Sequence, residues 1–289
     1  MISTTCFICK NPRFLCKCDN SWDTFDSILE SCNGKCENGI SYSNLSISTI
    51  TTCFNFNQEI DLKLLKEKLP KNFNINYNPT FKKSKVPKKK GTDAFYNSFD
   101  IKLTIADITK NPVLFSNISI FIFTNGKVKA AGAKTINTIN LMIGELIDLI
   151  NYIPMTVPDP KSLGVENIKI QMICSDFKIK PIKENPDGWC LKQEELKNIL
   201  VNECKLSATF SALSRYPGIN LKYPSVIDSG KNISLLIFRS GSIIITGAKN
   251  AKDMYTSYSF ITNTIAKHSS KLFYYDFNEE LKQTKKKLK

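Results

Sequence analysis

Histidine is nearly absent from this sequence, because its 289 residues contain only His268. A chain with one histidine cannot build most sites in which a histidine activates a serine or cysteine nucleophile. The sequence also lacks a P-loop, a carboxylate cluster and a Lys-Asp pair at catalytic spacing. We therefore expect a non-enzymatic protein, with His268 on the surface of a helix.

Long apolar runs are missing as well. No window is apolar for twenty residues, so the sequence predicts no transmembrane helix. Its start, MISTTCFICK, lacks the apolar core of a secretion signal. The ten cysteines are therefore expected in a reducing compartment, where they would not form a disulfide framework.

The charge is strongly positive, with 40 Lys and Arg against 26 Asp and Glu and a net charge of +14. Such an excess predicts a polyanionic partner, and nucleic acid is the first choice. A solvated basic surface, or a composition shaped by an A+T-rich genome, would give the same number. Charge alone therefore favours nucleic-acid binding only slightly.

Cysteine is concentrated at the start, where residues 1–36 hold six of the ten. We predict a separate cysteine-rich module over residues 1–40. Two of its pairs have the spacing of metal knuckles, and four thiolates would complete a tetrahedral zinc site. The zinc candidates are Cys6, Cys9, Cys32 and Cys36, with Cys16 and Cys18 as alternatives. The competing interpretation is a disordered arm with free thiols.

Nearly the same eighteen residues occur twice, as NISIFIFTNGKVKAAGAK at 117–134 and NISLLIFRSGSIIITGAK at 232–249. Asn125-Gly126 and Ser240-Gly241 predict a tight hairpin turn in each copy. The flanking patterns predict the same order twice: strand, short helix, strand, hairpin, long helix. The strands are expected at 46–56, 99–107, 168–179 and 217–223, the short helices at 61–69 and 192–200, and the long helices at 136–153 and 251–272.

This order predicts a tandem duplication, with repeats over 41–155 and 156–280. A lysine-rich insert at 82–93 interrupts the first repeat, and a basic tail at 281–289 follows the second. Alternation along the second hairpin places Ser234, Leu236 and Phe238 on one face of the sheet. Both faces carry apolar residues, which indicates either a binding surface or a strand buried on both sides.

LLIFRSGSIIITGAK resembles the hairpin signature of the TATA-box-binding protein family. Further landmarks of that family are matched by ISTITTCFNFNQEIDLKLL, by Asn76-Tyr77-Asn78-Pro79, by Ile170-Gln171 followed by IKPI, and by Tyr216-Pro217-Gly218. The resemblance covers residues 44–275, in order and in duplicate. It implies an α+β fold, a saddle-shaped, pseudo-twofold duplicated structure whose curved antiparallel sheet carries two long helices on the convex side.

The resemblance further implies a concave face that enters the minor groove, where apolar wedges unstack base steps and kink the duplex. Phe123 and Phe238 take the matched wedge position, and Tyr216 takes the partner position in the second repeat. Phe81, Phe95 and Phe99 compete in the first repeat, and Phe99 is favoured because it opens the strand after the insert. The other expected DNA contacts are Gln171, Leu236, Ile244, Thr246, Phe121 and Lys129, with Lys134, Lys249 and Lys222 as candidates for phosphate.

The first repeat departs from the family pattern, because Lys129 and Ala131 stand where Ile244 and Thr246 stand in the second. We therefore expect an altered sequence preference in that half. The leading interpretation is a transcription initiation factor that binds and bends A·T-rich promoter DNA. Its expected partners are general factors of the IIA and IIB type and RNA polymerase, and its expected location is the nucleus or, for a viral protein, a cytoplasmic viral factory or virion.

Two other functions fit parts of the pattern. A protein-interaction scaffold or inhibitor would keep the saddle and lose the DNA, as the altered first repeat suggests. An enzyme that acts on nucleic acid would also use such a saddle, but the sequence offers no catalytic constellation.

Overall fold

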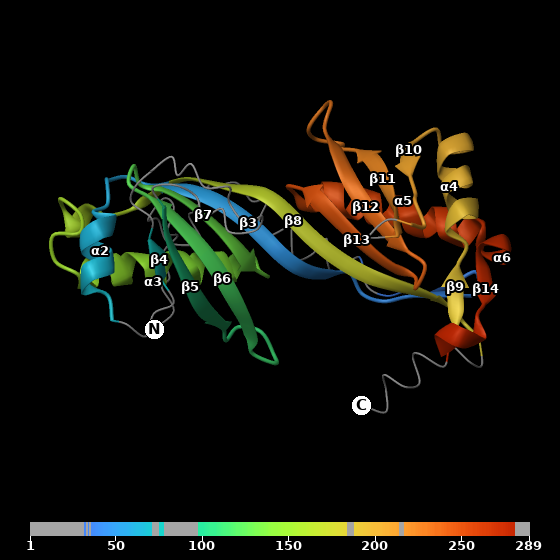
Figure 1. Cartoon of the computed structure of the whole chain (residues 1–289), viewed down its shortest axis with the longest axis horizontal. Helices are drawn as coiled ribbons and strands as arrows, with labels where there is room; N and C mark the ends of the chain where they lie inside the picture. The colour runs from blue at the N-terminus through green and yellow to red at the C-terminus, as the bar shows by residue number, and fades with distance from the viewer. Residues whose placement is uncertain are drawn as a thin grey trace. The chain divides into compact units, whose positions relative to one another are not determined.

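A computed structural model describes residues 32, 34, 36–70, 75–77, 98–183, 188–213 and 217–280 (Figure 1). The chain divides into two compact units. Unit 1 contains Thr49–Gln171, and unit 2 contains the described residues up to Ser48 and from Met172 onward. None of the described helices is long and apolar enough to span a membrane.

Unit 1 is an antiparallel sheet with strand order β8-β3-β7-β6-β5-β4. Strands β3 and β8 each contribute residues to both units. The elements of this unit are β3 (Ser46–Phe56), α2 (Leu62–Lys68), β4 (Ile75–Tyr77), β5 (Ser98–Asp107), β6 (Leu114–Phe123), β7 (Lys127–Ala133), α3 (Ile136–Tyr152), the short helix η2 (Pro160–Ser162) and the start of β8 (Val165–Pro181).

Unit 2 repeats this plan with strand order β10-β11-β12-β13-β8. Its elements are α4 (Gln193–Asn202), β10 (Ser207–Thr209), β11 (Gly218–Pro224), β12 (Asn232–Phe238), β13 (Ser242–Ala248), α5 (Ala251–Lys267) and α6 (Ser269–Leu272). It adds the hairpin β1 (Cys36–Glu37) and β2 (Ile40–Tyr42), and the pair β9 (Trp189–Leu191) and β14 (Phe273–Tyr275). Because β2 pairs with β8, residues 40–42 belong to the sheet of this unit.

The two hairpins have the same register, which confirms the duplicated α+β fold. Ser119 lies opposite Ala131, and Ser234, 115 positions later, lies opposite Thr246. Both turns close on a glycine with positive φ, 76° at Gly126 and 78° at Gly241. The two hairpins, β6–β7 and β12–β13, therefore have the same strand pairing and the same type of glycine turn.

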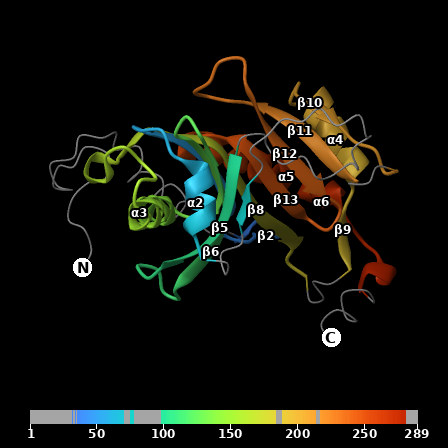
Figure 2. The same cartoon turned by 60° about the vertical axis from the view of Figure 1, so that its left-hand side comes forward.

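The two long helices are equally matched. Thr135 and Asn250 are their N-caps and accept hydrogen bonds from the backbone N–H groups of Thr138 and Asp253. Each helix buries one apolar stripe, which includes Met142 in α3 and Met254 in α5. Helix α3 packs on β5 and β7, and α5 packs on β12 and β13, so one sheet face in each unit is covered (Figure 2). The expected helix at 251–272 is interrupted at His268, which separates α5 from α6.

A buried carboxylate fixes the start of each long helix. In unit 1, Asp107 at the end of β5 accepts hydrogen bonds from Thr109, Thr135 and Asn137. In unit 2 the carboxylate lies on the helix instead, where Asp253 accepts from Ser225. The carboxylate thus comes from the strand in unit 1 and from the helix in unit 2. In both units it connects the end of a strand to the first turn of the long helix.

Replacing Asp107 with asparagine is expected to lower the free energy of unfolding by about 2 kcal/mol, because a charged acceptor of several hydrogen bonds is lost. Burial would raise the pKa of Asp107, but the hydrogen bonds from Thr109, Asn137 and Thr135 lower it below its ordinary value of 3.8. The carboxylate thus stabilises the fold above about pH 4, and this contribution is lost as the pH falls further. Urea unfolding measured from neutral to acidic pH should show a smaller loss of stability in the variant than in the native chain.

Asp148→Asn provides the control, since Asp148 is an exposed acid of α3. If both variants unfolded at the urea concentration of the native chain, the stabilising role of Asp107 would be refuted.

Candidate nucleic-acid interface

Alternation along the strands gives each unit one helix-covered face and one face that no described helix covers, which we call the open face. In β12, Ile233, Leu235 and Ile237 are buried, whereas Leu236 and Phe238 are partly exposed on the other side. The same pattern holds in β6, where Phe121 and Phe123 are partly exposed. The open face therefore carries the large apolar side chains that the sequence assigned to DNA contact.

In unit 2 the open face is ordered in cross-strand rows. The outermost row pairs Gly218 with Phe238 beside the turn. The next two rows run from β11 to β8 through direct register partners. They are Asn220, Leu236, Ile244 and Asp176, followed by Lys222, Ser234, Thr246 and Cys174.

Unit 1 repeats these rows with other side chains. Its outermost row pairs Ser98 with Phe123. The next two rows are Asp100, Phe121, Lys129 and Cys53, followed by Lys102, Ser119, Ala131 and Thr51. Phe123 and Phe238, Phe121 and Leu236, and Lys129 and Ile244 thus occupy equivalent positions.

Phe238 lies directly over Gly218. Its ring carbon Cε1 is 3.1 Å from the place where a Cβ on Gly218 would stand, so a larger residue would displace the ring. The neighbouring turn is anchored, because Arg239 bonds to the hydroxyl of Tyr274 and the carboxylate of Asp276. The close approach to Gly218 and the anchored turn therefore hold Phe238 in place, and its ring stays partly exposed.

The assignment of Phe99 to the open face is wrong. Its side chain is 0% exposed, and it lies opposite Ile122 on the helix-covered face. Phe99 is the equivalent of Ile219, a core residue of β11. Counted back from the hairpin register, the sequence equivalent of Tyr216 is Tyr96, and both lie outside the described residues, as do Phe81 and Phe95.

The lysines predicted to contact phosphate differ in their surroundings. Lys222 lies on the open face, where its Nζ donates to Ser234 Oγ at 2.7 Å. Lys102 is its exposed equivalent in unit 1, which the sequence comparison missed because the insert obscured the count. Lys249 instead lies 3.3 Å from the carboxylate of Asp228 in the β11–β12 turn, and Lys134 is half-buried at the end of β7. Lys222 and Lys102 are therefore the better-placed pair.

Gln171 is exposed on β8 and lines a groove of about 560 Å³ in unit 1. Cys53, Asn55 and Lys127 line the same groove. Lys127 and Lys169 line it together with Glu166, so the groove offers hydrogen bonds and charges of both signs.

Cys174 on the open face is a poor nucleophile. Burial raises the pKa of Cys174, so its thiol stays protonated at neutral pH. Asp176 in the next row accepts a hydrogen bond from Ser48 Oγ at 2.6 Å. No histidine lies on these rows.

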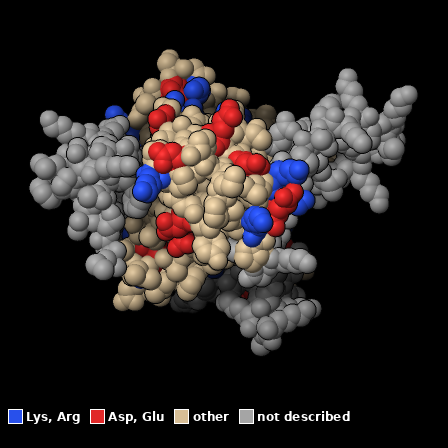
Figure 3. All heavy atoms as spheres, turned by 90° about the vertical axis from the view of Figure 1, so that its left-hand side faces the viewer, with Lys and Arg blue, Asp and Glu red and all other residues tan. Residues whose placement is uncertain are grey.

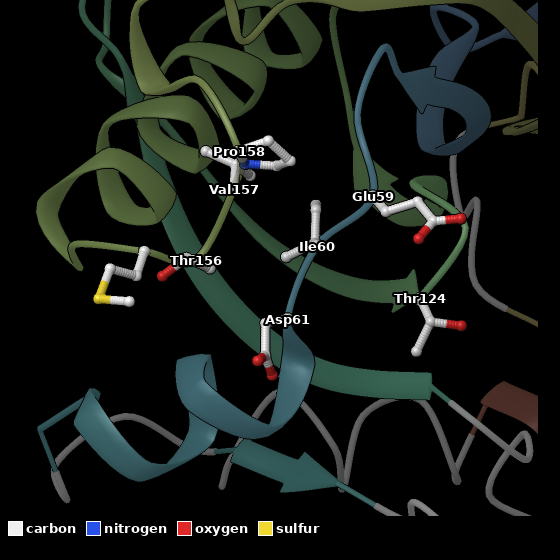
Figure 4. Close-up of a pocket in the computed structure, with 8 residues that line it drawn as sticks. Glu59, Ile60, Asp61, Thr124, Thr156, Val157 and Pro158 are labelled. Carbon is white, nitrogen blue, oxygen red and sulfur yellow. The ribbon is translucent and has the colours of Figure 1, made fainter.

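A second hollow, of about 510 Å³, lies among the loops of unit 1 that follow β3, β6 and α3 (Figure 4). Glu59 and Asp61 line it together with Ile60 and Val157. Asp61 already accepts from the N–H of Leu64 as the N-cap of α2. Figure 3, viewed from the side where α2 lies in Figure 1, shows acidic and basic side chains interspersed on the described surface. The described residues of this face therefore form no single patch of positive charge.

The zinc hypothesis stays a prediction. Cys32 is buried and Cys36 is exposed, and Cys6, Cys9, Cys16 and Cys18 lie outside the described residues. Within the part of the chain that the structure describes, no three potential ligands gather.

Comparison with known proteins gives one family. Residues 196–268 match the family model described as transcription factor TFIID (or TATA-binding protein, TBP). Over 259 residues the chain is 29% identical to a TATA-box-binding protein-like protein of Acanthamoeba polyphaga mimivirus, which covers 79% of this chain and 67% of the relative. It is 24% identical over 158 residues to the TATA-box-binding protein of Methanococcus maripaludis strain C7, covering 54% of this chain and 72% of the relative.

Among solved structures, Methanococcus jannaschii TBP aligns with a TM-score of 0.48 at 20% identity, covering 77% of this chain and 98% of that protein. The matched registers of its two hairpins make the chain a duplicated α+β protein. Its second repeat is similar to the TATA-binding-protein family.

Proposed function

We propose that this protein is a non-enzymatic transcription initiation factor that binds A·T-rich promoter DNA in the minor groove and bends it. The observation that carries the proposal is the matched placement of Phe123 and Phe238. Both lie at the same register position of their hairpins, on the open face and beside a turn. Partly exposed apolar side chains at two equivalent positions suit wedges that enter two base steps.

The rest of the open face agrees with this role. Leu236, Ile244 and Thr246 would form the apolar floor of the second repeat, while Lys222 and Lys102 would approach phosphates. The helix-covered faces would remain available for general factors of the IIA and IIB type and for RNA polymerase. Such a factor would act in the nucleus or, for a viral protein like the mimivirus relative, in a viral factory.

A protein-interaction scaffold is the second candidate, and Lys129 is the observation that favours it. A lysine stands in the row where the second repeat has Ile244, so the first repeat lacks that apolar contact. A face without that apolar contact fits the groove less closely, as expected of a face shaped for a protein partner.

The test is a short A·T-rich duplex with a fluorescent donor and acceptor at its ends, compared with a G·C-rich duplex of the same length. Binding that brings the dyes together on the A·T-rich duplex is the expected result. Salt-sensitive binding to both duplexes without a change in dye distance would mean that net charge alone holds the DNA. That outcome would refute the proposal and favour the scaffold.

A further inference from the structure

Both repeats carry a side-chain hydrogen-bond acceptor at one equivalent position of the open face. Asp100 of β5 lies opposite Phe121, and Asn220 of β11 lies opposite Leu236. Each is one row inward from the wedge, two residues along its strand from Ser98 or Gly218. Two residues of a strand span about 7 Å, so these acceptors lie within about two base pairs of a kinked step.

The acceptor in the second repeat, the side-chain oxygen of Asn220, makes no hydrogen bond within the described structure. The Oδ1 atom of Asn220 is buried and has no hydrogen-bond partner among the described residues. An amide oxygen left in this state destabilises the free protein, since water has been removed and nothing replaces it. A ligand that donates a hydrogen bond here would remove that cost.

The acceptor in the first repeat is also held in a poorly hydrated place. Asp100 is partly buried, and the hydroxyl of Ser98 donates to its Oδ1 at 3.0 Å. Burial raises the pKa of this carboxyl, which shows that the surroundings solvate its charge less well than water does. A carboxylate oxygen accepts more than one hydrogen bond, so the Ser98 contact leaves it further capacity.

Two other polar groups of the open face already have partners. Asp176 accepts from Ser48, and the hydroxyl of Thr246 contacts the sulfur of Met172 at 3.4 Å. Asp100 and Asn220, by contrast, both keep acceptor capacity for a ligand, and they do so at matched positions.

The floor of the minor groove offers only one kind of donor to such acceptors. A·T and T·A pairs present the acceptors adenine N3 and thymine O2, whereas a G·C pair adds the N2 amino group of guanine. An amide oxygen or a carboxylate opposite an A·T pair would thus face another acceptor. The amide of Asn220 can in addition donate from its nitrogen to a neighbouring groove acceptor.

We propose that Asn220 and Asp100 each accept a hydrogen bond from the N2 amino group of a guanine next to the kinked step of their own repeat. This inference rests on the proposed minor-groove binding. It replaces an all-A·T target with an A·T-rich tract that contains one preferred G·C pair in each half.

The test scans an A·T-rich duplex, changing one base pair at a time to G·C and then to inosine·C, which lacks the N2 amino group. We expect about tenfold tighter binding with G·C at one position in each half, and no gain with inosine at those positions. Asn220→Leu should abolish the gain in one half only, and Asp100→Leu in the other half only. Asn263→Leu, which changes an exposed residue of α5, should keep both gains.

Each outcome separates the inference from the function on which it rests. If the native chain bound and bent no duplex, the proposed function itself would be wrong. Bending with equal affinity for A·T and G·C at every position would overturn the guanine contact and leave the function intact. A guanine preference that survives both leucine variants would also overturn the assignment to Asn220 and Asp100.

Discussion

Replacing Phe238 with alanine is expected to leave the protein folded and to weaken binding to A·T-rich DNA about 100-fold, with the bend reduced. The ring would lose the apolar contact that it makes inside a base step, which is worth about 1.5–3 kcal/mol for a buried phenylalanine. The cost of unstacking would no longer be offset, so the duplex would stay closer to straight. Titration of the dye-labelled duplex measures affinity and end-to-end distance together.

Phe123→Ala should act in the same direction, because Phe123 holds the equivalent position in the first repeat. The double variant should bind with the salt dependence of a basic surface and without a bend. Phe277→Ala is the matched control, because Phe277 is an exposed phenylalanine of unit 2, 62% exposed and outside the open face. Native-like bending by the double variant would rule out the wedge mechanism.

The sequence predicted the element order well because each hairpin carries its own turn signal. Asn125-Gly126 and Ser240-Gly241 fix the register of two strands, and alternation then assigns every side chain to a face. Phe123, Phe238, Leu236 and Ile244 could therefore be placed by counting from the turn. The small elements β1, β2, β9 and β14 have two or three residues each and leave no periodic pattern to detect.

Phe99 shows where counting fails. The lysine-rich insert separates β5 from the family landmark before it, so the sequence gives no reference point from which to count along β5. Only the pairing with β6 shows that Phe99 is a core residue opposite Ile122. An error of one residue in a strand reverses its faces.

The acceptors at Asp100 and Asn220 were missed for a related reason. Each is a single polar residue between apolar ones, and such alternation is normal for a strand with one exposed face. Their equivalence appears only when the two registers are compared, and the unpartnered state of Asn220 Oδ1 appears only in three dimensions.

The second prediction concerns Gly241, where a change to alanine is expected to lower the free energy of unfolding by about 3–5 kcal/mol. Gly241 has a φ of 78°, which residues with a side chain rarely adopt. A Cβ there would also collide with the carbonyl oxygen of Ile179, whose own N–H donates to the Gly241 oxygen at 2.9 Å. The turn cannot move away from Ile179 without breaking this bond, so the strain stays in the hairpin that presents Phe238.

Gly230→Ala is the matched control, because it isolates the backbone cost from the collision. Gly230 has a φ of 81°, but a Cβ there would meet nothing within 4 Å. Only the left-handed conformation is then penalised, which costs about 1–2 kcal/mol. Urea unfolding followed by circular dichroism should show a much lower midpoint for Gly241→Ala than for Gly230→Ala. Equal midpoints would mean that β8 yields to the turn, and the close approach of Gly241 to Ile179 would not be what fixes the wedge.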